Sequence, residues 1–143
     1  MTRQQVEDLF TRRQEAMNRH DVACLSAMYT AEAVVESPTA GGTVRGRAAI
    51  DEIHRAWAAG FPDVAFSTEG LLVDDDRVVW FADVHGTDAG EFLGLPATGK
   101  PFSVPMVFVC TMENGLIRHE RRVYDFTGVL VQIGLLKMKG ASL

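Results

Sequence analysis

The chain has 143 residues, of which 47% are hydrophobic and 23% charged, and its formal net charge is −5. This length and composition predict one globular domain, residues 1–143, with a core large enough to need no disulfide or structural metal. The acidic balance argues against a nucleic-acid or membrane partner, because both select for a basic face. The N-terminus carries no signal-peptide pattern, and no run is long enough to span a bilayer. Cys24 and Cys110 lie among apolar neighbours and are expected to be free, buried thiols, so we expect a cytoplasmic protein.

Apolar residues at helical spacing predict three helices in the first half of the chain. Thr2 and Gln5 form a capping-box pattern before the first helix, and Asp21 can cap a second, shorter one. The third helix is expected to end near Gly60 and Pro62. The apolar faces of the three helices are Val6, Leu9, Phe10 and Met17; Val22, Leu25, Met28 and Tyr29; and Ile50, Ile53, Trp57 and Phe61.

After Pro62 the apolar period changes to that of strands. Four strands are predicted at 64–73, with a break near Gly70, and at 78–85, 102–112 and 116–124. Asn114-Gly115 is a strong hairpin signal, because a type I′ turn needs positive φ at both central residues. The apolar tail from Thr127 suits a short closing helix. The order predicts an α+β domain in which helices cover one face of a highly curved antiparallel sheet.

The sequence lacks the motifs that most metal and cofactor sites require. The four histidines lie far apart, without a His-Glu-x-x-His or Cys-x-x-Cys spacing. His85 and Asp88 could share an ion at a Gly-rich bend, but a polar strand end is the commoner arrangement. No Gly-x-Ser-x-Gly elbow is present, and the glycines between 86 and 99 do not form a phosphate loop. We therefore expect no metal and no organic cofactor.

Asp125 is the strongest candidate for acid–base chemistry. It follows the strand at 116–124 and precedes the apolar segment 129–136, so its surroundings are expected to be dry. Burial of a carboxylate disfavours its charged form and raises its pKa toward the range of a general acid or base. The alternative is that Asp125 caps the closing helix, which is an ordinary role for Asp.

Other residues are weaker candidates. Asp88 lies between glycines, where Asp is usually a turn residue, and either Glu120 or its neighbour His119 could carry a second proton. Large apolar residues are core by default, and some would line any cavity under a bent sheet. The residues considered for substrate contact are Trp57, Phe61, Phe92, Met106, Phe108, Glu120 and Tyr124.

Several segments together resemble the SnoaL-like family of polyketide cyclases. Residues 18–21, Asn-Arg-His-Asp, are similar to its opening helix pair, and 44–63 to its third helix and exit. The Gly-rich segment 86–99 resembles the family's Gly-Thr-His-x-Gly and Pro-x-Thr-Gly loop. Segments 114–117 and 124–134 resemble its last hairpin and its closing Gln-Leu-Gly. The resemblance covers nearly the whole chain.

This resemblance implies a cone-shaped α+β barrel with a deep pocket and a cofactor-independent aldol-type cyclisation of an apolar polycarbonyl substrate. It places Asp125 at the family's acid–base position, and it implies a homodimer or higher assembly through the sheet. Two positions depart from the family: Asp88 replaces a His, which His85 could offset, and Glu120-Arg121 replaces His-Trp. A non-catalytic ligand-binding protein, an isomerase and an epoxide hydrolase stay open as alternatives, because this fold serves all of them.

Overall fold

The computed structural model describes residues 1–92 and 94–137. The described residues form four helices and six strands. Their bounds are α1 Arg3–Asn18, α2 Val22–Ser26, β1 Tyr29–Ser37, β2 Gly42–Arg45, α3 Arg47–Gly60, β3 Ala65–Asp74, β4 Arg77–Thr87, β5 Pro101–Glu113, β6 Leu116–Tyr124 and α4 Phe126–Gln132. The pair β1–β2 lies between α2 and α3, and α4 closes the order. A single turn of 3₁₀ helix, Pro38–Ala40, joins β1 to β2.

The helix starts follow the local signals in the sequence. Thr2 Oγ1 accepts a hydrogen bond from Gln5 N at 3.1 Å, and Gln5 Oε1 accepts one from Thr2 N at 2.8 Å, which confirms the capping box of α1. Asp21 Oδ1 accepts from Cys24 N at 3.0 Å and so caps α2 as expected. These short-range contacts explain why the helix boundaries could be predicted from the sequence.

The strands form one open sheet in the order β2-β1-β6-β5-β4-β3. The pairs from β3 to β6 are antiparallel hairpins, and the Asn114-Gly115 turn has the expected positive φ values of 50° and 78°. Strand β1, which the sequence reading did not identify, runs parallel to β6 and antiparallel to β2. The α+β class, with N-terminal helices, a sheet and a short closing helix, is confirmed, but the prediction of a cone-shaped barrel with a highly curved antiparallel sheet is wrong: the sheet is mixed, is not strongly curled, and leaves β2 and β3 as unjoined edges.

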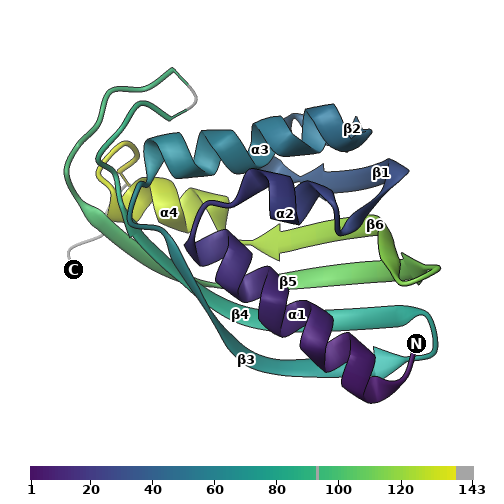
Figure 1. Ribbon diagram of the computed structural model, residues 1–143. Coiled ribbons are helices and arrows are strands. Elements are labelled where there is room, and N and C mark those ends of the chain that lie inside the picture. The colour runs from purple at the N-terminus through teal and green to yellow at the C-terminus, as the bar shows by residue number, and fades with distance from the viewer. Residues whose placement is uncertain (93, 138–143) are drawn as a thin grey trace.

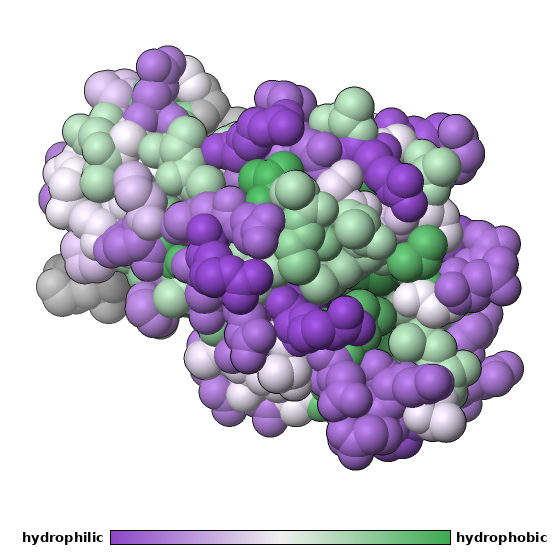
Figure 2. Space-filling model, in the orientation of Figure 1, coloured by the Kyte–Doolittle hydropathy of each residue, from purple (hydrophilic) through white to green (hydrophobic). Residues whose placement is uncertain are grey.

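All four helices lie on one side of the sheet, with α1 crossing its β3–β5 part and α3 running near β1 (Figure 1). Alternate residues of β4 and β5 point toward the helices, and this inner face carries buried side chains such as Trp80, Phe108 and Cys110. The helix-side surface is largely hydrophilic, with an apolar area over α2 (Figure 2). Within the described residues no helix is long and apolar enough to cross a membrane.

Candidate functional site

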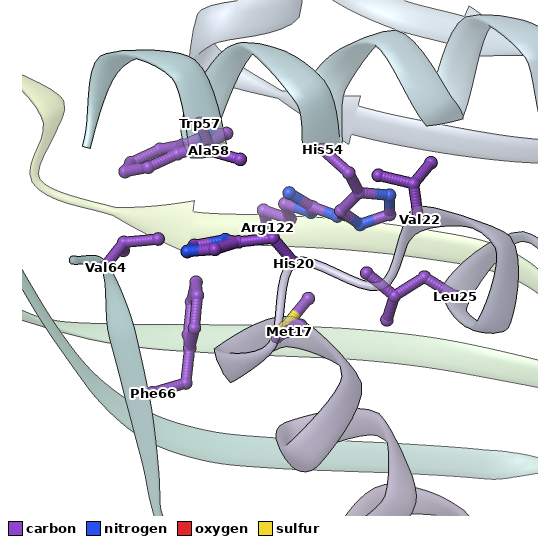
Figure 3. Close-up of a pocket in the computed structure, with 10 residues that line it drawn as sticks. All are labelled: Met17, His20, Val22, Leu25, His54, Trp57, Ala58, Val64, Phe66 and Arg122. Atoms are coloured by element: carbon purple, nitrogen blue, oxygen red, sulfur yellow. Dashed lines mark hydrogen bonds between the residues drawn. The ribbon is translucent and has the colours of Figure 1, made fainter. Parts of the chain in front are cut away.

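A small cavity lies between the helices and the inner face of the sheet (Figure 3). It holds about 340 Å³ of space when its open mouth is counted, but the enclosed part has room for about one water molecule. A larger ligand must therefore lie partly in the mouth or widen the cavity. Its walls come from α1, α2, α3, β3 and β6 and the turn after α1, and they are Met17, His20, Val22, Leu25, His54, Trp57, Ala58, Val64, Phe66 and Arg122.

A buried network of charged side chains lies under this cavity. Glu120 on β6 is fully buried and pairs with the equally buried Arg13 of α1 and, through Oε2, with Arg122 Nε at 2.8 Å. The hydroxyl of Tyr29 donates to the same carboxylate at 3.0 Å and accepts from Arg13 Nη2 at 2.8 Å. Cys110 Sγ donates to Glu120 Oε1 at 3.9 Å. One carboxylate therefore serves two guanidinium groups.

The two arginines stay charged in this dry setting. Burial is the largest single influence and lowers the pKa of each, but Glu120 and Tyr29 together outweigh it, so the pKa of Arg13 and of Arg122 is raised. For Glu120 burial acts upward, yet Arg13 and Arg122 together hold its pKa below the ordinary value. The aromatic faces of Tyr29, at 5.2 Å, and Phe108, at 5.6 Å, also lie under the Arg13 guanidinium.

His54 presents a fixed hydrogen-bond donor. Arg122 Nη2 lies 2.8 Å from His54 Nε2, and because an arginine can only donate, Nε2 must be the unprotonated nitrogen. Burial, together with Arg122 and Arg13, lowers the pKa of His54 well below its ordinary value, so the neutral ring carries its proton on Nδ1. Among the described residues this buried Nδ1 has no hydrogen-bond partner.

Trp57 supplies a second donor one helical turn further along α3. Its indole is buried and lines the cavity, and Nε1 finds no acceptor within the described part of the chain. A buried N–H without a partner costs free energy, about 1–3 kcal/mol by the usual measure. Two such donors beside one cavity indicate a site that an acceptor from outside the chain would complete.

His20 also lines the cavity, but it offers a hydrogen-bond acceptor where His54 and Trp57 offer donors. It occupies the left-handed position, φ 57°, of the turn that ends α1, in which His20 N bonds Met17 O at 3.1 Å and Asp21 N bonds Ala16 O at 2.9 Å. Its Nε2 lies 2.8 Å from Pro62 O, and since a carbonyl can only accept, Nε2 carries the proton. In this tautomer the lone pair of the ring is on Nδ1. In Figure 3 the ring lies between Val64 and Phe66 below Trp57.

Asp125 lies outside this cavity. Its side chain is exposed at the start of α4, where Oδ1 accepts from Gly128 N at 2.8 Å. The expectation of a dry environment around this carboxylate is wrong, because Asp125 lies between the end of β6 and the start of α4 with its side chain exposed to solvent. The geometry agrees with the helix-cap alternative.

Asp88 and His85 are also separate from the cavity. Asp88 is buried, and its Oδ2 accepts from Thr98 N and Thr98 Oγ1, both at 3.0 Å, so it holds the Gly-rich loop together. His85 is exposed on β4. The structure does not bring Asp125, Asp88 and His85 together as lining of one pocket.

Of the side chains considered for substrate contact, Trp57 alone is among the described residues that line the cavity. Phe61 and Phe92 are buried against Trp57, each with its ring centroid 5.4 Å from the indole. Tyr124 is half-buried with its ring 5.7 Å from the same indole. The remaining three are core or network residues on the sheet: Met106, Phe108 and Glu120.

No sequence pattern marked His20, His54 or Arg122 as a site residue. His54 lies on the apolar side of α3 together with Ile50 and Trp57, where a polar residue needs a partner. Arg13 interrupts the apolar stripe of α1 in the same way. These interruptions were the available signal, but the partner Glu120 lies 107 residues from Arg13 and only the fold joins them.

A family model described as SnoaL-like polyketide cyclase matches residues 7–133. A curated relative, the nogalonic acid methyl ester cyclase of Streptomyces nogalater, is 31% identical over 85 residues. That match covers 55% of this chain and 63% of the relative, so the chain spans less than two thirds of the relative's length.

Solved structures share the fold over most of the chain. TsrD of Streptomyces laurentii has a TM-score of 0.84 at 27% identity and covers 95% of this chain and 99% of its own. IdmH, a putative polyketide cyclase of Streptomyces antibioticus, has a TM-score of 0.76 at 26% identity, over 90% and 97% of the two chains. A SnoaL-like protein of Jannaschia sp. CCS1 is 22% identical with a TM-score of 0.82, over 94% of each chain, a likeness of fold alone.

Proposed function

Because the chain belongs to the SnoaL-like polyketide cyclase family, whose model covers residues 7–133, we propose that it closes a ring in an apolar polycarbonyl compound held in the cavity between α3 and β6. The reaction is an intramolecular aldol addition without metal or organic cofactor. In place of a carboxylate base, the reaction uses three side chains that line the cavity within the described residues: His20, His54 and Arg122.

The donor pattern of the cavity carries this proposal. His54 Nδ1 and Trp57 Nε1 are buried donors without a partner among the described residues, and Arg122 adds a guanidinium that can only donate. Carbonyl and enolate oxygens only accept. A neutral imidazole that donates to a carbonyl oxygen withdraws electron density from it without supplying a competing proton. The pocket is thus suited to stabilising an enolate.

The proton steps balance within the cavity. His20 Nδ1 takes a proton from the methylene between two carbonyl groups, whose C–H bond breaks as the enolate forms against the donors of His54 and Arg122. The enolate carbon then bonds to a second carbonyl carbon of the same molecule. The alkoxide that results takes the proton back from the His20 imidazolium. No electrons are gained or lost overall, so no redox partner is needed.

The test is turnover of a poly-β-ketone panel by the unmodified protein, His54→Phe and His20→Asn. Loss of one oxyanion donor is expected to lower kcat by about 10²–10³-fold in His54→Phe. Asn tolerates the left-handed backbone of residue 20 but offers no base, so His20→Asn should lose turnover while keeping its melting temperature. His119→Gln is the matched control, since His119 bonds Glu36 away from the cavity. Full activity in both cavity variants would overturn the assignment.

A second candidate function is ligand binding without turnover. It is favoured by one observation: no carboxylate is found among the described residues that line the cavity, and Asp125 is an exposed helix cap. On this alternative the same donors hold a carbonyl compound that does not react. A protein that binds the panel compounds, yet converts none of them, would favour this alternative over the cyclase.

A further inference from the structure

The network beneath the cavity has one more positive charge than negative charge. Arg13 and Arg122 are cations, and Glu120 is the carboxylate that pairs with both. Their other neighbours are neutral: burial raises the pKa of Tyr29 and of Cys110, and it lowers that of His54. Asp51, on the same helix as His54, accepts a hydrogen bond from Ser26 Oγ at 3.4 Å through its Oδ2. Among the described residues no second anion enters the network.

One of the two cations reaches the cavity. Arg13 is enclosed, with Glu120, Tyr29 and the faces of Trp80 and Phe108 around its guanidinium, and its Nε and Nη1 find no partner among the described residues. Arg122 instead lines the cavity, and its Nε and Nη2 are used by Glu120 and His54 while Nη1 makes no bond to a described residue. A buried cation without a full counter-charge is costly, and an anion placed in the cavity would remove that cost.

We infer that the ligand of this cavity is an anion, a small apolar or aromatic acid bound as its carboxylate, with the carboxylate oxygens toward Arg122 and the donors of His54 and Trp57, and the apolar body against Leu25, Val64 and Phe66. This inference rests on the proposed function for the place of the site. It adds that a free acid is preferred to the corresponding neutral ester. A guanidinium and two N–H donors match carboxylate oxygens in charge and in hydrogen-bond sense.

The experiment compares benzoate with methyl benzoate by calorimetric titration at pH 7.5 and matched ionic strength. The two probes share an aromatic ring and differ in the charge of the carboxyl group. Benzoate is expected to bind at least about tenfold more tightly, as a charge-assisted pair in a dry site would give. Equal binding, or tighter binding of the ester, would overturn the inference.

Two substitutions on neighbouring residues of β6 locate the effect. Arg122→Met removes the cavity cation and should reduce the preference for the acid to less than about twofold, while Arg122→Lys should retain part of it. Arg121→Met is the control, because Arg121 is exposed on the other face and pairs with Glu36. An acid preference that survives in Arg122→Met but not in Arg121→Met would contradict the placement. If Arg122→Met does not fold, the acid and ester titrations of the unmodified protein still decide.

The same titrations separate this inference from the proposed function. Acetophenone, a neutral ketone, tests whether the cavity accepts a carbonyl compound at all. Binding of acetophenone and methyl benzoate as tight as that of benzoate would leave the carbonyl site standing and remove the anion preference. Tight benzoate binding without turnover of any polyketone would support the anion site and count against the cyclase.

Discussion

At the scale of single residues, the polar side chains of this molecule divide into those that hold the fold and those that face the cavity. Asp125 and Asp88 accept hydrogen bonds from nearby backbone N–H groups and so stabilise a helix start and a loop. His54 and Trp57 instead keep unpaired donors in buried positions. Unpaired buried donors cost stability, and such costs tend to persist at sites where a ligand is bound.

The capping role of Asp125 leads to a clear expectation. Asp125→Asn should change the free energy of unfolding by less than about 0.5 kcal/mol, because Asn caps as well as Asp, whereas Asp125→Ala should cost about 1 kcal/mol. Neither substitution should alter turnover of a polyketone substrate. Urea denaturation and steady-state rates measure both properties. A stable Asn variant without activity would restore Asp125 as the acid–base residue.

His54 should make stability depend on pH. Its pKa is lowered in the folded protein from an ordinary value of 6.5, mainly by burial and then by Arg122 and Arg13. The unfolded chain therefore binds a proton that the folded chain does not, so the contribution is complete above about pH 6.5 and declines as pH falls below it. The slope is up to about 1.4 kcal/mol per pH unit for one proton. Glu120, whose pKa is lowered from 4.5, adds a further loss at more acidic pH.

Urea denaturation between pH 7.5 and 5 measures this dependence. His54→Gln should flatten the profile by about one proton. An unchanged slope in His54→Gln would mean that His54 is charged in the folded protein.

At the scale of elements, local signals predicted more than distant ones. The capping box of α1, the end of α3 and the Asn114-Gly115 hairpin depend on residues within a few positions of each other, and all three were predicted. The parallel pairing of β1 with β6 was missed. It joins Val34 to His119, which are far apart in the sequence, and no turn links the two strands. The polar lining of the cavity was missed for the same reason, because α1, α3 and β6 meet only in the fold.

The Gly-rich loop after β4 is held against the end of α3 by close backbone approach. Gly90 N and Ala89 N both bond to Gly60 O, at 3.0 and 3.2 Å. A Cβ on Gly90 would lie 1.9 Å from Ala59 O, so Gly90→Ala must move the loop and loosen Phe92 from Trp57. We expect a loss of about 1–3 kcal/mol in the free energy of unfolding, together with a change in tryptophan fluorescence.

Gly70→Ala is the matched control for this loop, because a Cβ there meets nothing within 4 Å. It should change stability by less than about 0.5 kcal/mol, as an ordinary surface substitution does. Equal stability of the Gly90 and Gly70 variants would show that the loop does not depend on this approach.

At the scale of the whole molecule, the helices of the described residues leave the outer face of the sheet uncovered (Figure 1). Phe81, Val107 and Val123 form one cross-strand row on that face, and Phe81 and Val123 are 37% and 52% exposed. Leu72 on β3, paired with Val79, extends the apolar area and is 61% exposed. We propose that two copies of the chain associate through this face, because exposed apolar rows of this kind mark interaction surfaces.

Light scattering over micromolar concentrations tests the association. The unmodified protein should give the mass of a dimer or larger assembly, and Val123→Glu should give a monomer of unchanged fold. Thr11→Glu, an exposed change on α1, should behave as the unmodified protein. A monomer at all concentrations before any substitution would contradict the proposed interface.

The central claim is that the cavity between α3 and β6 binds a ligand through donors that the chain leaves unpaired. The chain contains two tryptophans, so a ¹⁵N–¹H spectrum has two indole signals. Trp57 Nε1 lacks a partner among the described residues, whereas Trp80 Nε1 already donates to Thr68 Oγ1 at 2.9 Å. Titration with benzoylacetone, assigned with Trp57→Phe, should move the Trp57 signal downfield to saturation and leave that of Trp80 in place. A Trp57 signal that stays fixed while the compound binds would contradict the account.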